Sequence, residues 1–340
     1  MTDTAVLRTS ALTIGYRQNG KTVSVCQGLD LALHKKQFVC LLGANGAGKS
    51  TLLRTLSGVL PPLGGNVYVE GTDIGQMSKA ALAHKVSLVL TDTVQAGNLS
   101  VYTVLTLGRY PYSGWLGMLN ATDRAIIRDA AEATGIQAFL DKNIHELSDG
   151  ERQKVMIARA LVQDTPVIIL DEPTAHLDLP NRVTIVRLLR NLVQRTGKSV
   201  LLSTHELDLA LQAADRVWLM MPNQSMLCGT PEDLILDGTF EAAFRREGFE
   251  FNRATGTFQV HTPEPGKTIH LSGEVQEVFW TGRALQREGY LLTERNDCPT
   301  RVYAGMYNGT AGWTLRHHDS TCMFNTVAGL LEHLQQKHND

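Results

Sequence analysis

The chain has 340 residues, which predicts one large α/β domain and a smaller second domain. Its 32 basic residues are balanced by 34 acidic ones, and the net charge of −2 gives no overall field that favours nucleic acid or anionic lipid as a partner. The five cysteines are widely spaced and form no CxxC pair, which argues against a zinc or dithiol centre and favours reduced, mostly buried thiols.

The N-terminal residues MTDTAVLRTS have neither a basic segment nor an apolar segment of the kind found in secretory leaders. No later stretch approaches the roughly 20 apolar residues of a membrane-spanning helix. We therefore expect a soluble chain that stays in the cytoplasm. The first predicted elements are antiparallel strands at Leu12–Tyr16 and Gln27–Leu33, where apolar and polar residues alternate on either side of a turn at Asn19-Gly20.

Three later segments are short, continuous apolar runs, as expected of strands buried on both faces of a mostly parallel sheet. They are Phe38–Leu42, Val167–Leu170 and Val200–Leu202, and each is followed by glycine or polar residues. In open α/β sheets, ligands bind beyond the carboxyl ends of the strands. We therefore expect the residues after these three strands to converge on one site.

The first strand is followed by Gly43-Ala-Asn-Gly-Ala-Gly-Lys-Ser-Thr51, which contains the phosphate-loop pattern between a buried strand and a leucine-rich helix. Glycines let backbone N–H groups surround a phosphate, and the helix that begins near Ser50 turns its positive end toward the anion. Lys49 is predicted to reach the β and γ phosphates of ATP, and Ser50 to ligate Mg²⁺. The predicted nucleotide contacts of this loop are Gly43, Asn45, Gly46, Ala47, Gly48, Lys49, Ser50 and Thr51.

The second strand is followed by two adjacent carboxylates, Asp171 and Glu172. Asp171 is the predicted partner of Mg²⁺, and Glu172 the predicted general base that polarises water for in-line attack on the γ-phosphoryl group. The alternative is that the pair caps a following helix, because Pro173-Thr174 resembles a helix start. After the third strand, His205 is predicted to contact the γ-phosphate and help position water, unless its role is structural.

Leu147-Ser-Asp-Gly-Glu-Arg-Gln153 precedes a helix with apolar spacing through Val155, Ala158 and Val162. With this segment, the sequence resembles the ATPases of ABC transporters over roughly residues 5 to 245. Gly43–Thr51 resembles their Walker A loop, Leu147–Gln153 their signature, Val167–Glu172 their Walker B strand, Leu177-Asp178 their D-loop and His205 their switch histidine.

The resemblance implies a P-loop fold of the ABC type, with a mostly parallel core sheet, an antiparallel β subdomain and a helical subdomain at about residues 92–160. It also implies that Tyr16 stacks on adenine. Two copies are expected to close head to tail on two ATP molecules, so that Ser148 and Gly150 of one copy complete the site of the other, and Asp178 is a further expected nucleotide-binding residue. Hydrolysis is then expected to reopen the dimer.

The sequence departs from the family at two places. Asp149 replaces the usual third-position glycine of the signature, which leaves the helix N-terminus intact. After the strand Val86–Leu90, Thr91 stands where the family has a glutamine, and Gln95 comes four residues too late. An oxygen of Thr91 or Asp92 can still ligate Mg²⁺ or orient water, the alternative being that these residues only connect two parts of the fold.

The segment Leu107–Tyr112 resembles one that is common in the ATPases of importers for iron siderophores, haem and cobalamin. Arginine and tyrosines suit an interface with membrane subunits, the alternative being a solvated loop. The expected function is therefore that of an ATP-hydrolysing motor on the cytoplasmic side of the inner membrane. Its expected partners are transmembrane permease subunits and, indirectly, a substrate-binding protein, and its expected cargo is a ferric siderophore, with haem or cobalamin next.

The family pattern ends at about residue 260, and His261–Lys267 has the proline and glycine content of a linker. We expect an ATPase domain at 1–258, a linker at 259–267 and a small α/β or α+β domain at 268–340. In that domain, strands are predicted at Lys267–Leu271, Val275–Phe279, Tyr290–Thr293 and Arg301–Tyr303, with helices near Gly282–Arg287 and Thr326–Gln336. His317, His318 and Cys322 lack a recognisable ligand spacing, so surface polar residues are favoured over a metal site.

Other classes of ABC protein fit less well. A DNA-maintenance protein would carry a long coiled coil between its Walker motifs, and a ribosome-acting one would carry two ATPase units. A soluble assembly ATPase shares the single unit, but the segment Gly108–Tyr112 argues against it. A nucleotide-gated regulator that does not hydrolyse ATP is disfavoured by Glu172 and His205, while the altered segment at Thr91 keeps it open.

Overall fold

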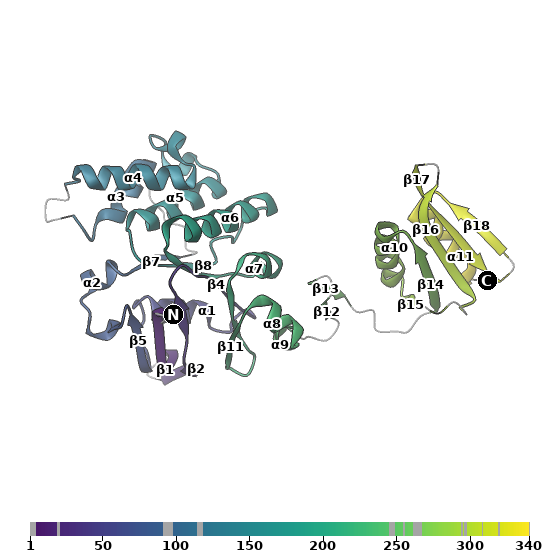
Figure 1. Cartoon of the computed structure of the whole chain (residues 1–340), viewed down its shortest axis with the longest axis horizontal. Coiled ribbons are helices and arrows are strands. Elements are labelled where there is room, and N and C mark those ends of the chain that lie inside the picture. The colour runs from purple at the N-terminus through teal and green to yellow at the C-terminus, as the bar shows by residue number, and fades with distance from the viewer. Residues whose placement is uncertain are drawn as a thin grey trace. The chain divides into compact units, whose positions relative to one another are not determined.

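The computed structural model of the chain is drawn in Figure 1. It describes residues 5–18, 21–90, 98–113, 118–244, 249–253, 256–260, 267–293, 295, 298–307, 309–318 and 320–339. Two compact units are present, one formed by Met1–Arg245 with Arg253–Thr257 and the other by Arg246–Asn252 with Phe258–Asp340.

The first unit is built on a six-stranded sheet whose order is β11-β10-β4-β9-β8-β7. All its neighbouring strands are parallel except the antiparallel pair β10 and β11. Every residue of β4, β8 and β9 is buried, which explains why their sequences are continuously apolar. The strands are β4 (Phe38–Gly43), β7 (Val86–Val89), β8 (Val167–Asp171), β9 (Ser199–Ser203), β10 (Arg216–Met220) and β11 (Met226–Gly229).

An antiparallel sheet has the order β2-β1-β5-β6, with β3 also paired to β1. Its strands are β1 (Ala5–Gln18), β2 (Lys21–Leu29), β3 (Ala32–His34), β5 (Gly64–Val69) and β6 (Thr72–Asp73). The prediction of a single strand at Gln27–Leu33 is wrong. The chain turns at Asp30, whose Oδ1 accepts a hydrogen bond from the N–H of Ala11 at 2.8 Å, and it then pairs with a different part of β1. The turn predicted at Asn19-Gly20 lies outside the described residues.

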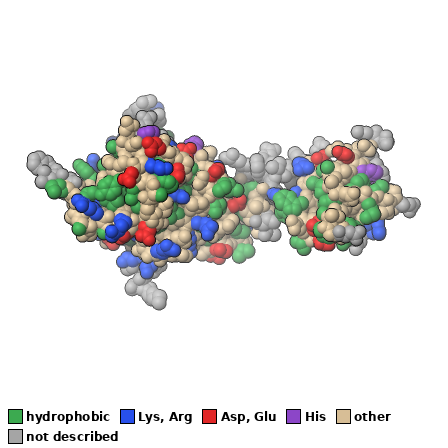
Figure 2. Space-filling view, turned by 90° about the horizontal axis from the view of Figure 1, so that it is seen from above, with side chains coloured by type: hydrophobic (Ala, Val, Ile, Leu, Met, Phe, Trp, Pro, Cys, Tyr) green, Lys and Arg blue, Asp and Glu red, His purple; other side chains and the backbone are tan. Residues whose placement is uncertain are grey.

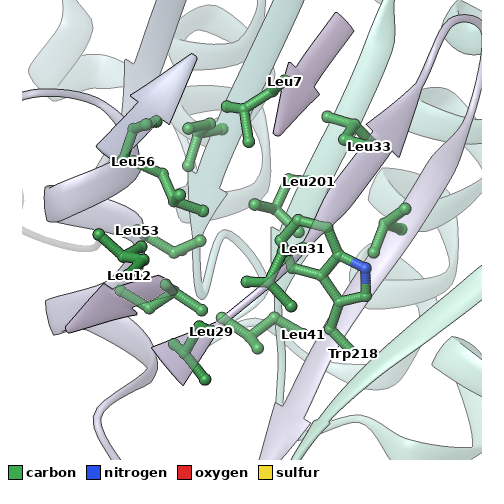
Figure 3. Packing of buried hydrophobic residues seen from close by; sticks show 14 of the residues in the cluster. Leu7, Leu12, Leu29, Leu31, Leu33, Leu41, Leu53, Leu56, Leu201 and Trp218 are labelled. Carbon is green, nitrogen blue, oxygen red and sulfur yellow. The ribbon is translucent and has the colours of Figure 1, made fainter. Parts of the chain in front are cut away.

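One apolar core joins the two sheets and holds the first helix, α1 (Lys49–Leu56), between them. Figure 3 shows leucines of β1, β3, β4, β9 and α1 in one apolar cluster with the indole of Trp218 on β10. Because α1 begins directly after the glycine-rich loop, this core fixes the position of that loop. The residues labelled in the figure are Leu7, Leu12, Leu29, Leu31, Leu33, Leu41, Leu53, Leu56, Leu201 and Trp218.

A helical layer is formed by α3 (Val101–Thr106), α4 (Ala121–Thr134) and α5 (Asp149–Val162), which lie together in Figure 1. The other helices of this unit are α2 (Lys79–Ala83), α6 (Leu179–Thr196), α7 (Leu207–Ala213), α8 (Pro231–Leu236) and α9 (Thr239–Phe244). Short 3-10 segments occur at Ile74–Gln76, Leu107–Arg109, Gln137–Phe139 and Ile144–Glu146. No helix among the described residues is both long enough and apolar enough to cross a bilayer.

Arg109 is not part of a surface, contrary to the sequence-based prediction. It is only 6% exposed, and its Nε donates to Oδ1 of Asp123 on α4 at 2.8 Å. Nη1 donates to the carbonyl oxygen of Val162 at 3.0 Å, and the guanidinium stacks on the ring of Tyr112 at 3.7 Å. The arginine therefore ties the segment after α3 to α4 and α5. Its neighbour Tyr110, by contrast, is 79% exposed.

The second unit contains a five-stranded sheet of order β15-β14-β16-β17-β18. The strands are β14 (Thr268–Gly273), β15 (Leu291–Thr293), β16 (Thr300–Tyr307), β17 (Thr310–His317) and β18 (Ser320–Phe324). Its helices are α10 (Val275–Arg287) and α11 (Val327–Asn339), and a separate pair of strands is formed by β12 (Phe249–Asn252) and β13 (Thr257–Val260).

The strand predicted at Val275–Phe279 is wrong, because these residues form the first turns of α10. Val278 packs against the core of this unit, with the buried Thr281 and Leu285 three and seven positions further along, and this spacing is helical. The strands β17 and β18 were not predicted. Acidic and basic side chains are mixed on the face drawn in Figure 2, in agreement with the nearly balanced charge of the chain.

Candidate active site

The residues that follow β4, β8 and β9 lie at one edge of the core sheet. These strands are neighbours in the order β4-β9-β8 and run parallel, so their carboxyl ends meet. Hydrogen bonds join the three segments: Ser50 donates to Asp171 at 3.2 Å, and the N–H of Glu172 donates to the hydroxyl of Ser203 at 3.0 Å. The structure thus brings together residues from three separate parts of the sequence.

The glycine-rich loop requires glycine for its backbone shape. Gly46 and Gly48 have φ angles of 78° and 107°, in the left-handed region that side chains disfavour. A Cβ atom at Gly48 would also lie 2.1 Å from Cγ1 of Val25 on β2. Gly48 is the N-cap of α1 and uses no side chain, so the first turn of that helix presents its backbone N–H groups at the loop.

Lys49 is the first residue of α1 and is only 5% exposed. Its ammonium group donates to the carbonyl oxygens of Gly43 at 3.0 Å and Ala44 at 3.3 Å. Burial lowers the pKa of this ammonium group, and the nearby carboxylates of Glu172 and Asp171 oppose that shift. The loop thus places a positive charge where a phosphate is expected.

Asp171 ends β8 and is 3% exposed. Its Oδ1 accepts hydrogen bonds from two hydroxyls, Ser50 at 3.2 Å and Ser203 at 2.7 Å. Carboxylate and hydroxyl oxygens are the hard donors that Mg²⁺ prefers. The side chains of Ser50 and Asp171 therefore have donor oxygens that fit a magnesium ion, and Thr91 lies outside the described residues.

Sequence reasoning assigned no role to Ser203. Its importance depends on the register, in which Ser203 on β9 is the direct partner of Asp171 on β8, and no signal in the sequence gives that register. Its hydroxyl donates to the carboxylate of Asp171 at 2.7 Å and accepts from the backbone N–H of Glu172 at 3.0 Å. One buried serine therefore positions both acidic residues.

Glu172 has a φ angle of 48°, so the chain turns sharply as it leaves β8. Its carboxylate lies 2.5 Å from Nε2 of His205, which follows β9, and both side chains are partly exposed. The alternative reading of Asp171 and Glu172 as a helix cap is wrong. The next helix, α6, begins at Leu179, and Asp178 caps it by accepting from the N–H of Asn181 at 3.0 Å.

The signature residues occupy the start of α5. Ser148 is its N-cap. Its hydroxyl accepts from the N–H of Glu151 at 3.3 Å, and its own N–H donates to the carboxylate of Glu151 at 2.9 Å, which forms a reciprocal capping box. Gly150 is buried against α6, where a Cβ atom would lie 2.7 Å from Oδ1 of Asn181. Among the described residues, no hydrogen bond or ion pair joins Ser148 or Gly150 to the phosphate loop of the same chain.

Tyr16 lies on β1 and is 43% exposed. It pairs with Val23 on β2, the same strand whose Val25 lies against Gly48. The antiparallel sheet therefore places an accessible aromatic ring on the ribbon that flanks the phosphate loop.

A phosphate loop at the N-terminus of a helix, with two carboxylates and a histidine at the ends of the neighbouring parallel strands, defines a P-loop ATPase. The antiparallel sheet and the helical layer give this ATPase the ABC form. Sequence comparison supports the same class: the family profile described as "ABC transporter" matches residues 26–175. A second profile, "Iron ABC transporter C-terminal domain", matches residues 266–335.

The chain belongs to the family of ABC transporter ATP-binding proteins, and it is an ATPase. It is 34% identical to the achromobactin transport ATP-binding protein CbrD of Dickeya dadantii over 68% of this chain and 85% of that protein. It is 37% identical to the iron(3+)-hydroxamate import ATP-binding protein FhuC of Bacillus subtilis over 59% of this chain and 74% of that protein.

A solved structure with the same fold is CbiO1 of Clostridium perfringens, part of the ABC transporter complex CbiONQ. It is 28% identical to this chain, with a TM-score of 0.60 over 70% of this chain and 95% of that one.

Proposed function

We propose that this chain is the motor of an importer for ferric siderophores, and that two copies close on two molecules of ATP. The observation that carries the catalytic part of the proposal is the hydrogen-bonded group of Ser50, Asp171, Ser203 and Glu172 beside Lys49. This group combines a phosphate-binding cation, oxygen ligands for Mg²⁺ and a partly exposed carboxylate within one site.

In the proposed reaction, the loop Gly43–Thr51 and Lys49 hold the phosphates of ATP, and Ser50 and Asp171 would hold Mg²⁺. The bound ion would supply positive charge against the charge that develops on the phosphate oxygens. Glu172 accepts a proton from the water that attacks the γ-phosphorus, while the bond from the γ-phosphorus to the bridging oxygen breaks, so that ADP and phosphate leave. His205 lies 2.5 Å from the Glu172 carboxylate, a distance that supports a shared role in orienting this water.

Dimer closure is proposed because one chain does not complete the site. Ser148 and Gly150 stand at the N-terminus of the 14-residue helix α5, which presents partial positive charge to an anion. We propose that they, with Asp178, contact the ATP held by the phosphate loop of the partner copy, while Tyr16 stacks on adenine.

The two units support a domain organisation in which residues 1–258 form the ATPase domain, 259–267 a linker and 268–340 an accessory domain. The match of residues 266–335 to the C-terminal domain of iron ABC transporters supports a ferric chelate as the cargo. The Bacillus subtilis relative is named as an iron(3+)-hydroxamate import protein, and this name further supports a ferric chelate as the cargo.

Transmembrane permease subunits are the proposed direct partners, at the cytoplasmic face of the membrane, with a substrate-binding protein acting through them. The helical layer offers an accessible surface of suitable chemistry, with Leu107 51%, Tyr110 79% and Tyr112 40% exposed. Aromatic residues of this kind are enriched at protein interfaces.

The test of the motor is Mg²⁺-dependent ATPase activity of the purified chain over a range of protein concentrations, compared with Glu172→Gln. Activity that rises faster than linearly with protein and is lost in the variant supports a dimeric ATPase with Glu172 as base. Glu232→Gln, a substitution of an exposed glutamate in the first turn of α8, is the matched control and should keep full activity. ATP binding without turnover in the presence of the permease would instead identify a nucleotide-gated regulator.

The cargo is tested by uptake in cells that produce either the unaltered chain or Glu172→Gln. Loss of radiolabelled iron uptake from a ferric siderophore, with haem and cobalamin uptake unchanged, is the expected result. Loss of haem or cobalamin uptake alone would reassign the cargo. Normal uptake of all three would favour a soluble assembly ATPase.

A further inference from the structure

The five-stranded sheet of the second unit has two chemically different faces. Helices α10 and α11 pack on the face that carries Ile269, Val302 and Leu315, and Nε1 of Trp313 donates to Thr281 of α10 at 2.6 Å on this side. Because side chains alternate between the faces of a strand, the residues between these positions point to the opposite face.

Three of those residues form a row across the sheet. His270 on β14 pairs directly with Arg301 on β16, and Arg301 pairs with Arg316 on β17. Neighbouring strands are about 4.8 Å apart, so the three basic side chains start within roughly 10 Å of one another. His270 is 9% exposed, and its Nδ1 lies 3.1 Å from the carbonyl oxygen of Thr293, which fixes the orientation of the ring.

A second row lies beside the first and is rich in hydroxyl groups. Ser272, Tyr303 and Thr314 are direct neighbours on β14, β16 and β17. The hydroxyl of Tyr307 lies 2.9 Å from that of Thr314, so both side chains are held in place. Ser272 and Tyr303 can each donate a hydrogen bond to an oxygen of a ligand, and Thr314 can do so as well when its hydroxyl accepts from that of Tyr307.

Two glycines make room for the tyrosine rings. A Cβ atom at Gly312 would lie 2.7 Å from Cδ2 of Tyr307, and one at Gly305 would lie 2.9 Å from Cε1 of Tyr303. The rings therefore lie against the backbone of the sheet, and together with the two rows they line an open cavity of about 300 Å³ on the surface of the unit, where Arg301 and Arg316 are exposed. Sites for small molecules start at about this volume.

Within the described part of the chain, the positive charges of the arginines in the cavity are not balanced by negative ones. No carboxylate there forms an ion pair with Arg301 or Arg316, and the contact of Arg301 is a hydrogen bond from its Nε to the carbonyl oxygen of Cys298 at 3.1 Å. Like charges directly opposite each other on neighbouring strands are destabilising. A bound anion would relieve this repulsion.

We propose that this cavity binds a small molecule with two or more negatively charged oxygens, carried on carboxylate or phosphate groups. Guanidinium groups hold such oxygens in pairs, and the hydroxyls of Ser272, Tyr303 and Thr314 supply further donors. This ligand site is separate from the nucleotide site of the first unit and does not depend on the proposed cargo.

The test is calorimetric titration of the full chain with citrate and, separately, with pyrophosphate. Both titrations use a Lys49→Ala background, so that the phosphate loop does not bind the pyrophosphate. The expected result is saturable binding of one ligand per chain. Binding of citrate alone identifies carboxylate chemistry, and binding of pyrophosphate alone identifies phosphate chemistry. Binding of neither anion overturns the proposal.

Substitutions locate the site. Arg301→Gln and Arg316→Gln should each weaken binding about tenfold or more, because each removes charge-assisted hydrogen bonds. Arg287→Gln removes the same charge from α10, on the other side of the sheet, and should leave the affinity unchanged. Arg316→Lys keeps the charge but not the paired donors. Its affinity for the anion should lie between those of the unaltered chain and Arg316→Gln. Unchanged binding in both glutamine variants, with melting curves that show a folded chain, would place the anion elsewhere and overturn the proposal.

Discussion

Ser203 on β9 donates a 2.7 Å hydrogen bond to the carboxylate of Asp171 on β8, directly across from it in the sheet. The same hydroxyl accepts from the N–H of Glu172. One serine therefore positions both the proposed metal-binding carboxylate and the proposed general base. Partners of this kind orient metal ligands, and their loss typically weakens metal affinity 10- to 100-fold.

Ser203→Ala is therefore expected to raise the Mg²⁺ concentration that gives half-maximal ATPase activity by about 10- to 100-fold. Binding of ATP without metal should change little, because the phosphate loop is intact. The control is Ser199→Ala, at the other end of the same strand, where the hydroxyl bonds to the carbonyl oxygen of His34 at 3.0 Å. An equal effect of both substitutions would mean that Ser203 only stabilises the sheet.

Lys49→Ala is expected to abolish measurable ATP binding by equilibrium dialysis, because it removes the buried ammonium group of the phosphate loop. Burial lowers the pKa of this group, so its charge is lost at a lower pH than that of an ordinary lysine. ATP affinity of the unaltered chain should therefore decline on the alkaline side before an exposed lysine would lose its proton. Lys198→Ala, which removes a lysine paired with Asp164 at 2.6 Å, should bind ATP normally.

Gly150→Ala tests the packing at the start of α5. The added methyl group would lie 2.7 Å from Oδ1 of Asn181, and overpacking of this kind costs about 1–3 kcal/mol. ATPase activity should fall, and it should recover in the double variant Gly150→Ala/Asn181→Ala, where the space is restored. Failure of the double variant to recover would indicate that Gly150 also allows close approach of the ATP held by the partner copy.

Much of this site could be predicted from the sequence because its parts are local. Buried parallel strands are continuously apolar, and glycine or polar residues follow each of the three, as Glu172 follows Asp171 at the end of β8. Ser203 could not be assigned a role in this way, because its importance depends on which strand lies beside β9 and in which register. That information is carried by tertiary packing.

Arg109 was predicted to lie on a surface but is buried. An arginine between a glycine and a tyrosine is typical of an exposed segment, and its partner Asp123 lies 14 positions away on α4. The burial of Arg109 results from the packing of α4 beside it, which the local sequence does not show. For the same reason, the alternation around Val275 suggested a strand, although the residues that face the core follow a helical period.

Arg109→Gln is expected to destabilise the first unit by about 3–5 kcal/mol, because it leaves the buried carboxylate of Asp123 without its charged partner. The loss also removes the stacking of the guanidinium on Tyr112. Urea unfolding followed by circular dichroism measures the change. Arg128→Gln, a 76% exposed arginine on α4, should stay within about 0.5 kcal/mol of the unaltered chain, and an equal loss in both variants would contradict a role for burial.

The same ion pair predicts a pH dependence. The backbone N–H of Asn120 and the guanidinium of Arg109 hold the pKa of Asp123 below its usual value. A carboxylate whose pKa is lowered by folding adds stability above its unfolded pKa of about 3.9, and this contribution is lost as the pH falls through the folded value. The stability difference between the unaltered chain and Asp123→Asn should therefore be constant from neutral pH to about pH 5 and shrink below it. Urea unfolding at a series of pH values measures this difference, and a difference that stays the same down to pH 3 would show that the charge of Asp123 does not stabilise the fold.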